Sequence, residues 1–448
     1  MSGNNTKKFF GTDGIRGIAG KFPLTKNFVK QIALYSAFVL KKKFTSKKFF
    51  IGWDTRESSN WISKILMDSL KNAGFEVHKV GVFPTSGIAY LCKKYSSLGV
   101  VISASHNPYE FNGIKFFSPQ GIKLADKIEL EIEQLLTNKP KIKNSKEKGI
   151  VKDFSSTAEL DYLSFLEEVF KNFSFPFRRL KLVIDCANGS TYKIAQKIFT
   201  KFFPRVKFIN IHPNGKNINK NCGSLHPEVL LKKLNKGQIG ICFDGDGDRV
   251  IFVDENKNIR DGDYIIGILA TEYKRKKMLT NCFVIPTVMS NLGLLKYLWS
   301  KDIKTILAPV GDKYVYEYMK DHNSILGGEQ SGHIILWKYL QTGDGIITAL
   351  EILKVLLENK TTLFNLSQIF NKYPQVLKNI KTNSKPPVEK VFPKNILKQF
   401  EKKIEGRIFI RYSGTEPLLR IMAEGKDKNK INEVVQKLEN IFIEYIKK

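Results

Sequence analysis

The chain alternates short apolar segments with segments whose apolar residues recur at helical spacing. In its first part, strands predicted over 49–52 and 75–80 flank a helix that ends at residue 72, and another apolar segment covers 100–102. This alternation favours a parallel sheet covered by helices. The same order returns twice, and a smaller unit follows. We therefore predict an α/β chain of three similar mixed α/β domains and a smaller α+β C-terminal domain, divided as 1–155, 156–254, 255–370 and 371–448.

The length and composition agree with several domains. At 448 residues the chain is too long for one ordinary core, and 42% hydrophobic with 26% charged residues is typical of a globular protein. No apolar run approaches the roughly 20 residues that span a bilayer, and we expect no signal peptide at the start. The five cysteines are scattered and lack the spacing of a zinc site, which predicts reduced thiols in a cytoplasmic protein.

The formal net charge of +30 raises the question of nucleic-acid binding. Most of this charge is lysine spread along the whole chain, without a dense basic tail or a patch that interleaves aromatic and basic residues. We therefore expect neither a nucleic-acid nor a membrane partner. A positive field of this kind would instead attract an anionic substrate.

One segment joins a buried strand to a polar turn. The apolar run 100–102 ends abruptly at Ser-Ala-Ser-His-Asn-Pro, residues 103–108. In α/β folds ligands bind at the carboxyl ends of strands, and Pro108 prevents simple continuation of the strand. A serine presented there is a candidate nucleophile or phosphate carrier. The alternative is an ordinary turn rich in serine and asparagine.

A second polar turn, DGDGDR, directly follows a strand predicted over 239–243. Its carboxylates, Asp244, Asp246 and Asp248, would repel one another at close range unless a cation neutralised them. Oxygen ligands of this kind suit Mg²⁺ or Ca²⁺. An EF-hand is excluded, because Arg249 stands where the turn glycine belongs. Mg²⁺ usually shares its ligand shell with phosphate, which a phosphoserine would supply. The alternative is an acidic surface turn.

Three further motifs are typical of anion or sugar binding. The glycine-rich segment 9–17 (FFGTDGIRG) leaves Arg16 with little steric cover, as a phosphate-binding side chain requires. Near the C-terminus, Arg411, Arg420 and the turn between them offer two guanidinium groups and two hydroxyls to an anion. The segment 327–333 (GGEQSGH) carries groups that bind sugar hydroxyls or an amine, namely Glu329, Ser331 and His333. Each motif alone also fits an ordinary structural turn.

Taken together and in this order, the motifs resemble the α-D-phosphohexomutase superfamily, most closely its branch that acts on glucosamine phosphates. The resemblance covers nearly the whole chain and rests on FFGTDGIRG, ISASHNP with NGIK, CGSLHPE with DGDGDR, TVMSNLGL, VGD, GGEQSGH, TGDG and RYSGTEPLLRIMAEG. It implies four domains around a central cleft, each contributing one loop. It also implies interconversion of glucosamine 6-phosphate and glucosamine 1-phosphate through glucosamine 1,6-bisphosphate, for UDP-N-acetylglucosamine and cell-wall synthesis.

The resemblance also implies roles for single residues. Ser105, and not Ser103, would be the phosphorylated serine. The Mg²⁺ ligands would be Ser105, through its phosphate, Asp244, Asp246 and Asp248. Catalytic assistance would come from Lys115, His333 and Arg16. Substrate binding would fall to Glu329, Ser331, Arg249, Arg411, Ser413, Gly414, Thr415 and Arg420. The chain departs from the family pattern at Phe111, Tyr412 and Lys313, none of which is a predicted metal ligand.

Several choices stay open in the sequence. The SGT form of the last loop and the GEQSGH segment favour glucosamine phosphates over the mannose or glucose phosphates of sister mutases. A metal-dependent phosphatase is the alternative from another class, and it would not need the second phosphate site that Arg411 and Arg420 predict. The general base is either Lys115 or His333. The oligomeric state is not fixed, with a homodimer as one option.

Overall fold

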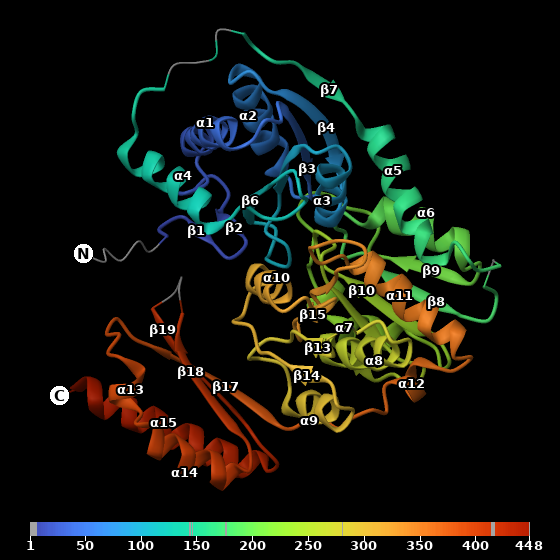
Figure 1. Ribbon diagram of the computed structural model, residues 1–448, viewed down its shortest axis with the longest axis vertical. Coiled ribbons are helices and arrows are strands. Elements are labelled where there is room, and N and C mark those ends of the chain that lie inside the picture. The colour runs from blue at the N-terminus through green and yellow to red at the C-terminus, as the bar shows by residue number, and fades with distance from the viewer. Residues whose placement is uncertain are drawn as a thin grey trace.

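The structure, a computed structural model, describes residues 7–142, 145, 147–174, 177–279, 281–413 and 417–447. Four units follow one another along the chain, and Figure 1 shows them in order from blue to red. Three are mixed α/β units and the fourth is a smaller α+β unit, which confirms the predicted fold class. The residue numbers at which we divided these units stay predictions.

The first unit contains a seven-stranded mixed sheet with the order β1-β2-β6-β5-β3-β4-β7. Strands β3, β4, β5 and β7 run parallel, whereas β6 joins antiparallel to β5. Its elements are β1 (Phe10–Gly11), β2 (Gly14–Ile18), α1 (Lys26–Lys43), β3 (Lys48–Trp53), α2 (Ser59–Asn72), β4 (Glu76–Val82), α3 (Thr85–Lys94), β5 (Leu98–Ile102), β6 (Phe111–Phe117), α4 (Asp126–Asn138) and β7 (Val151–Asp153).

Strand β5 shows why the buried strands of this sheet are apolar at consecutive positions. Val100 and Ile102 belong to the core that includes residues of α1, α2 and α4, whereas Val101 belongs to the core on the side of α3. Successive side chains of a strand point to opposite faces, so a strand covered on both faces must be apolar throughout. The burial of β5 therefore delivers the polar turn that follows it to the edge of the sheet.

The second unit contains a five-stranded sheet with the order β12-β11-β10-β8-β9. Strand β10 runs parallel to β8 and antiparallel to β11, so the turn after β10 lies at the edge where β8 also ends. Its elements are α5 (Ser155–Glu167), β8 (Leu182–Asp185), α6 (Tyr192–Phe202), β9 (Val206–Ile209), α7 (Pro227–Lys233), β10 (Ile239–Phe243), β11 (Val250–Val253) and β12 (Ile259–Arg260), with 3-10 turns at Glu168–Phe170 and Gly223–Leu225.

The third unit has shorter strands. Two pairs, β13-β14 and β15-β16, are joined by an isolated bridge between Ile285 and Gly327. Pro286 and Pro309 follow the first pair, and proline lacks the N–H that a longer ladder needs. Its elements are α8 (Gly262–Arg275), β13 (Phe283–Val284), α9 (Leu292–Ser300), β14 (Lys304–Thr305), α10 (Asp312–Asp321), β15 (Leu326–Gly328), β16 (Ile334–Leu336), α11 (Gly345–Glu358) and α12 (Leu363–Leu366).

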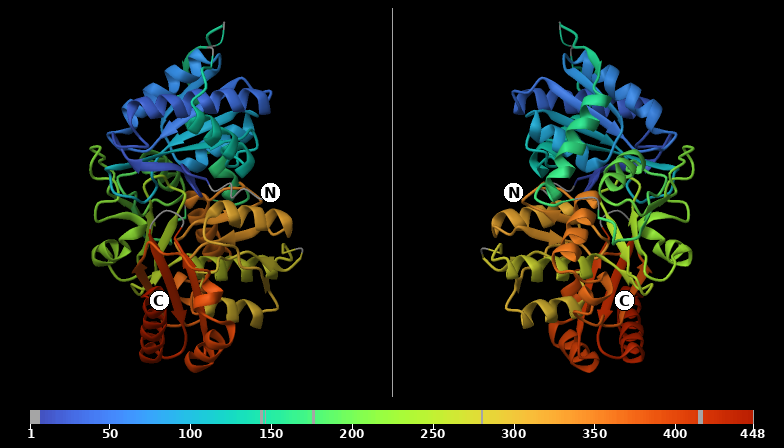
Figure 2. Two further views of the ribbon diagram at one scale, coloured as in Figure 1. Left: turned by 90° about the vertical axis from the view of Figure 1, so that its left-hand side faces the viewer. Right: turned by 90° about the vertical axis from the view of Figure 1, so that its right-hand side faces the viewer.

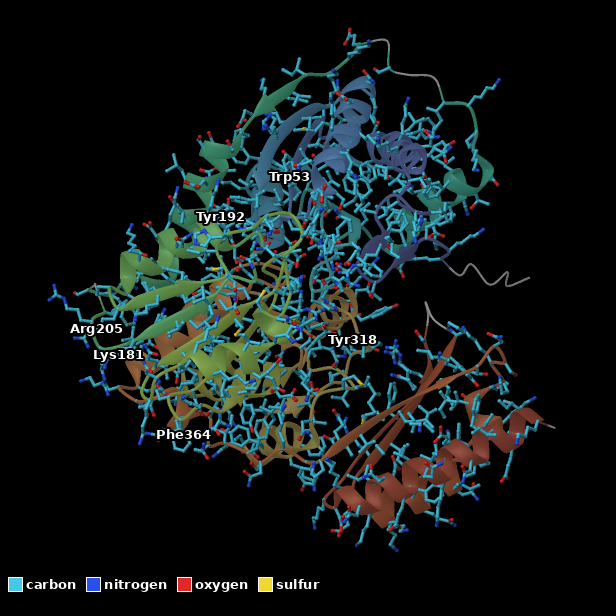
Figure 3. All side chains as sticks on the ribbon, turned by 180° about the vertical axis from the view of Figure 1, so that it is seen from behind. Trp53, Lys181, Tyr192, Arg205, Tyr318 and Phe364 are labelled. Atoms are coloured by element: carbon cyan, nitrogen blue, oxygen red, sulfur yellow. The ribbon has the colours of Figure 1, made fainter. Side chains whose placement is uncertain are left out.

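The fourth unit is an antiparallel sheet, β17-β19-β18, with a hydrophobic core of its own. Figure 2 shows it at the opposite end of the molecule from the first unit, and in Figure 3 it stands beside the third. Glu424 connects it to that unit by accepting the Leu292 N–H at 2.9 Å. Its elements are β17 (Gln375–Lys381), α13 (Val388–Val391), α14 (Lys394–Ile404), β18 (Arg407–Tyr412), β19 (Leu418–Glu424) and α15 (Lys428–Lys447).

Two further predictions concern the chain as a whole. The described helices include none with the length and apolar character of a membrane span. The five cysteines are unpaired, and four of them are buried.

Candidate active site

The turn after β5 presents one serine to the second unit. The Ser105 backbone has a φ of 51°, in the left-handed region that non-glycine residues seldom occupy. Its N–H donates to Ser103 Oγ at 2.8 Å, and its side-chain hydroxyl donates to Asp244 Oδ2 at 2.7 Å. Ser105 is buried, so this hydroxyl faces the second unit and not bulk solvent.

A buried ion pair after β3 holds the serine turn in place. Arg56 and Asp54 lie 2.8 Å apart, and Asp54 also accepts the Ser103 hydroxyl at 2.6 Å. The Arg56 guanidinium donates to the carbonyls of Ser105, Asn107 and Pro108, three acceptors of one turn. The sequence analysis missed this pair. Its signal was the position of both residues directly after the predicted strand 49–52.

The three aspartates after β10 form a buried cluster. One carboxylate oxygen from each of Asp244, Asp246 and Asp248 lies within 4.8 Å of the others. Gly245 lets the two turns approach, because a Cβ there would lie 2.6 Å from the Ser105 carbonyl oxygen. Burial, together with the charges of Asp248 and Asp246, raises the pKa of Asp244 well above its usual range. Burial acts in the same sense on Asp246, but Lys115, the Thr85 hydroxyl and Arg16 together lower the pKa of that carboxyl.

This cluster fits a divalent metal ion. Within the described part of the chain, Asp246 Oδ1 and Asp248 Oδ1 are buried without a hydrogen-bond donor. Buried carboxylate oxygens need a compensating partner, and three converging hard oxygens match the ligands of a divalent cation. The residues present could therefore hold such an ion beside the Ser105 hydroxyl.

Two cations of the first unit face the cluster. Lys115, on β6, lies 2.7 Å from Asp246 Oδ2 and 2.8 Å from Asp13 Oδ2. Arg16, on β2, pairs with Asp13 and donates to Asn107 Oδ1 at 3.3 Å. Burial lowers the pKa of Arg16. Asp13 thus connects both predicted catalytic cations, a role that its position inside FFGTDGIRG did not reveal.

The third unit contributes a histidine to the same place. His333 precedes β16 and is buried, with its Nε2 atom 3.5 Å from Asp312 and 3.9 Å from Asp248. An isolated backbone bridge pairs His333 with Arg249, whose Nε lies 3.8 Å from Asp248 Oδ1. Burial opposes it, but the three aspartates and Glu329 raise the pKa of Arg249. Sequence analysis did not identify Asp312.

The predicted sugar loop lies between β15 and β16. Glu329 is buried and accepts the Gly311 N–H at 2.8 Å through Oε1. Ser331 is exposed two residues further along. This loop therefore has one acid held by the backbone and one hydroxyl open to a ligand.

The arginine pair lies on the fourth unit. Arg411 and Arg420 are direct partners across β18 and β19 and line a cavity of about 170 Å³. Met289 and Val310 of the third unit line the same cavity. Burial and then the charge of Arg420 lower the pKa of Arg411, as expected for two like charges kept together. Such a pair fits an anion. Ser413 is buried next to this pair, whereas Gly414 and Thr415 lie outside the described residues.

The structure therefore brings most of the predicted residues into two places. The first three units bring together a serine hydroxyl, three carboxylates, three cations and a histidine; these are Ser105, Asp244, Asp246, Asp248, Lys115, Arg16, Arg249 and His333. The arginine pair lines a different cavity, which Val310 of the third unit also lines. A nucleophile, a candidate metal site and proton carriers in one place suit phosphoryl transfer, and a separate cationic cavity suits a second phosphate.

Comparisons with known proteins agree with this geometry. Models of the phosphoglucomutase/phosphomannomutase family match α/β/α domain I over 7–143, domain II over 161–258, domain III over 261–373 and the C-terminal domain over 353–441. The chain is 39% identical over 437 residues to a phosphoglucosamine mutase of Brucella abortus, covering 96% of each chain. It is 43% identical over 439 residues to one of Carboxydothermus hydrogenoformans, covering 96% and 98%.

Solved structures share the fold at lower identity. A phosphoglucomutase/phosphomannomutase family protein of Burkholderia thailandensis matches with a TM-score of 0.78 and 20% identity, covering 97% of this chain and 96% of that chain. The N-acetylphosphoglucosamine mutase of Aspergillus fumigatus, in complex with GlcNAc-6P and magnesium, matches with a TM-score of 0.71 and 16% identity, covering 98% and 96%.

Proposed function

Because the chain belongs to the phosphoglucomutase/phosphomannomutase family, with phosphoglucosamine mutases among its relatives, we propose that it interconverts glucosamine 6-phosphate and glucosamine 1-phosphate. It is a mutase, and its substrate is a phosphorylated amino sugar. The observation that carries this proposal is the Ser105 hydroxyl, which lies 2.7 Å from Asp244 inside the carboxylate cluster. That contact supports the proposal because Asp244 belongs to the only group of three acids within 4.8 Å found among the described residues.

In the proposed cycle Ser105 carries the phosphoryl group that it transfers. The free hydroxyl of the sugar attacks phosphorus and gives its proton to a base, while the bond from phosphorus to the Ser105 oxygen breaks and that oxygen takes up a proton to become the serine hydroxyl. This yields glucosamine 1,6-bisphosphate, which turns over in the site and returns its other phosphoryl group to Ser105. His333 and Lys115 are the candidate bases, since both lie beside the cluster. Arg16 and Lys115 stabilise the charge on the phosphoryl oxygens.

The remaining roles follow from position. Asp244, Asp246 and Asp248, with the Ser105 phosphate, would hold Mg²⁺, which neutralises charge on the transferring phosphoryl group. Glu329 and Ser331 bind the sugar, and Arg249, whose pKa the charge of Glu329 helps to raise, binds the substrate with them. Arg411 and Arg420, with Ser413, Gly414 and Thr415, hold the phosphate that does not react. We place the protein in the cytoplasm, as its unpaired cysteines favour.

A coupled assay with glucosamine 6-phosphate, Mg²⁺ and a trace of glucosamine 1,6-bisphosphate tests this function. Ser105→Ala should abolish conversion, because no other group carries the phosphoryl group. Ser103→Ala is the matched control: it removes the hydroxyl that accepts the Ser105 N–H but leaves the three Arg56 contacts to the turn, so it should keep a phosphorylated Ser105, visible by mass spectrometry of the peptide.

Three results would contradict the proposal in different ways. Preference for mannose 6-phosphate or glucose 6-phosphate would keep the mechanism and change the substrate. Release of inorganic phosphate without an isomer would indicate a metal-dependent phosphatase. Full activity of Ser105→Ala would exclude the phosphoserine cycle altogether.

A further inference from the structure

Four consecutive residues before and at the start of α10 contact separate parts of the molecule. Val310 lines the arginine cavity, and the Gly311 N–H donates to Glu329 in the sugar loop. Asp312 contacts Lys123 of the first unit and His333 of the third, and Lys313 lies 2.9 Å from Glu129 on α4. The proposed function uses the arginine cavity and Glu329, which Val310 and Gly311 contact, but it gives no role to Asp312.

Asp312 is half-buried and lies between two partners, the Lys123 ammonium and the His333 ring. Its carboxylate pairs with Lys123 Nζ, and His333 Nε2 lies 3.5 Å away. Burial opposes ionisation, but the charge of Lys123 and then that of His333 hold the pKa of Asp312 below its usual range. A carboxylate kept ionised at this distance attracts an N–H of the imidazole ring and so favours one orientation of that ring.

His333 has few other partners that could fix its ring. Among the described residues, neither ring nitrogen has a hydrogen-bond partner, and the ring packs against the backbone of Gly343, where a Cβ would lie 2.4 Å from Nε2. The other carboxylate near Nε2 is Asp248 at 3.9 Å, which belongs to the metal cluster. Of these two carboxylates, Asp312 is the nearer to Nε2, and it lies outside the metal cluster.

The pair of Asp312 and Lys123 is not held by dense packing on its outer side. Both residues line a cavity of about 360 Å³ between the first and third units, together with Leu124, Tyr316 and Ile335. Lys123 also pairs with Asp13, which contacts Lys115. Charges thus join the two candidate proton carriers across the boundary between the units, by way of Asp13, Lys123 and Asp312.

We propose that Asp312 is a positioning residue, which orients the His333 ring toward the reacting oxygen and connects it, through Lys123, to the first unit. The inference rests on the proposed function, because it assigns to Asp312 an effect on phosphoryl transfer. It does not make Asp312 a substrate ligand. Orientation of a proton carrier changes the rate of the chemical step more than it changes binding, and a displacement of about 1 Å can cost about 10²-fold.

The test uses the full-length protein and measures kcat and KM separately. Asp312→Asn keeps the size of the side chain and removes its charge, and we expect kcat to fall about 30-fold with KM within about threefold. Asp312→Glu restores the carboxylate and should recover part of the lost rate. Lys313→Met is the matched control. It breaks a neighbouring contact between the same two units, so it should lower the melting temperature at least as much and leave kcat within about twofold.

A double-mutant cycle with His333→Ala separates positioning from general damage. If Asp312 acts through His333, then Asp312→Asn should have no further effect on kcat in a chain that already lacks the imidazole. Additive losses, an unchanged kcat in Asp312→Asn, or an equal loss in Lys313→Met would each overturn the proposal. The kcat values of the cycle are measured with whichever sugar phosphate the wild type converts. If the wild type converts none, the proposed function is overturned as well. If the wild type is active, a failed test overturns only the role given to Asp312.

Discussion

The serine and aspartate turns and the arginine pair are built in opposite ways. The two turns grow out of units that share one continuous hydrophobic core, to which Val101, Phe243 and Ile346 of the first three units all belong. The arginine pair stands on the fourth unit, whose core is separate and whose contacts with the third unit include hydrogen bonds at Leu292, Ser290 and Asn291. One region is fixed by packing, and the other is attached by a few hydrogen bonds.

This difference separates chemistry from recognition. Phosphoryl transfer depends on groups that hold their positions before the substrate arrives, which a shared core provides. A phosphate bound on a separate unit can instead draw that unit toward the site, and the binding energy of the non-reacting phosphate then assists the chemical step. Closure of this kind also excludes water from a reactive phosphoserine.

The largest effect should come from the aspartate cluster. Asp244→Asn should lower kcat by at least about 10³-fold, because it removes one charge from the metal site and a carboxylate from the Ser105 hydroxyl. The melting temperature without Mg²⁺ should stay the same or rise. The variant no longer buries a charged carboxylate at this position, and it removes the repulsion from Asp248 and Asp246. Calorimetry and a Mg²⁺ titration of activity measure both effects.

Asp185→Asn is the matched control for this prediction. Asp185 ends β8, one strand away, and accepts the N–H groups of Ala187 and Gly223 at 2.8 and 2.9 Å. Its loss should cost about 1–3 kcal/mol of stability and leave the Mg²⁺ dependence unchanged. Equal Mg²⁺ responses in the two variants would show that the cluster has no special role.

The arginine pair should give the next largest effect. Arg411→Met should lower kcat/KM by about 10²-fold, since one charge-assisted contact to the phosphate is lost. The melting temperature should not fall much, because like charges opposed across a sheet destabilise it. Lys378→Met, which removes a cation of the same sheet paired with Glu439, should leave kcat/KM unchanged. A similar loss of kcat/KM in both variants would show that the effect comes from the net charge of the fourth unit and not from the arginine pair.

The smallest effect should come from the contact between the third and fourth units. Burial raises the pKa of Glu424, although Arg407 opposes it. A carboxyl whose pKa is raised by folding binds more protons in the folded state. It stabilises the fold fully below its unfolded pKa of about 4.5, and this contribution is lost as the pH rises through its folded value. Glu424→Gln should therefore flatten this fall in melting temperature above pH 4.5 and change KM by less than about threefold.

Glu405→Gln provides a control of opposite sign in the same unit. Its bond to Lys426 lowers the pKa of the exposed Glu405, so its contribution to stability is lost as the pH falls below about 4.5. Melting temperatures of both variants between pH 3 and 7 should therefore deviate from the wild type at opposite ends of the range. Parallel curves would contradict the role given to Glu424.

Some features of the fold were readable from short segments. The strand predicted over 239–243 is β10 in the structure, with the same bounds and every residue buried. Strand β17, in contrast, carried no usable pattern. Most of its side chains are exposed or half-buried, and it is a strand because β19 pairs with it over seven residues. Propensity decides little where a partner strand supplies the hydrogen bonds.

The sequence by itself determined the polar turns that end buried strands, and with them the serine and the three aspartates, because burial and turn chemistry are local properties of the chain. It could not show that Arg56 holds the turn of Ser105, or that Asp312 stands between Lys123 and His333. Those contacts join residues far apart in the chain, and an ion pair produces no repeating pattern of residues in either segment by which the sequence could predict it. Only the tertiary structure, within each unit and between units, decided which charges would meet.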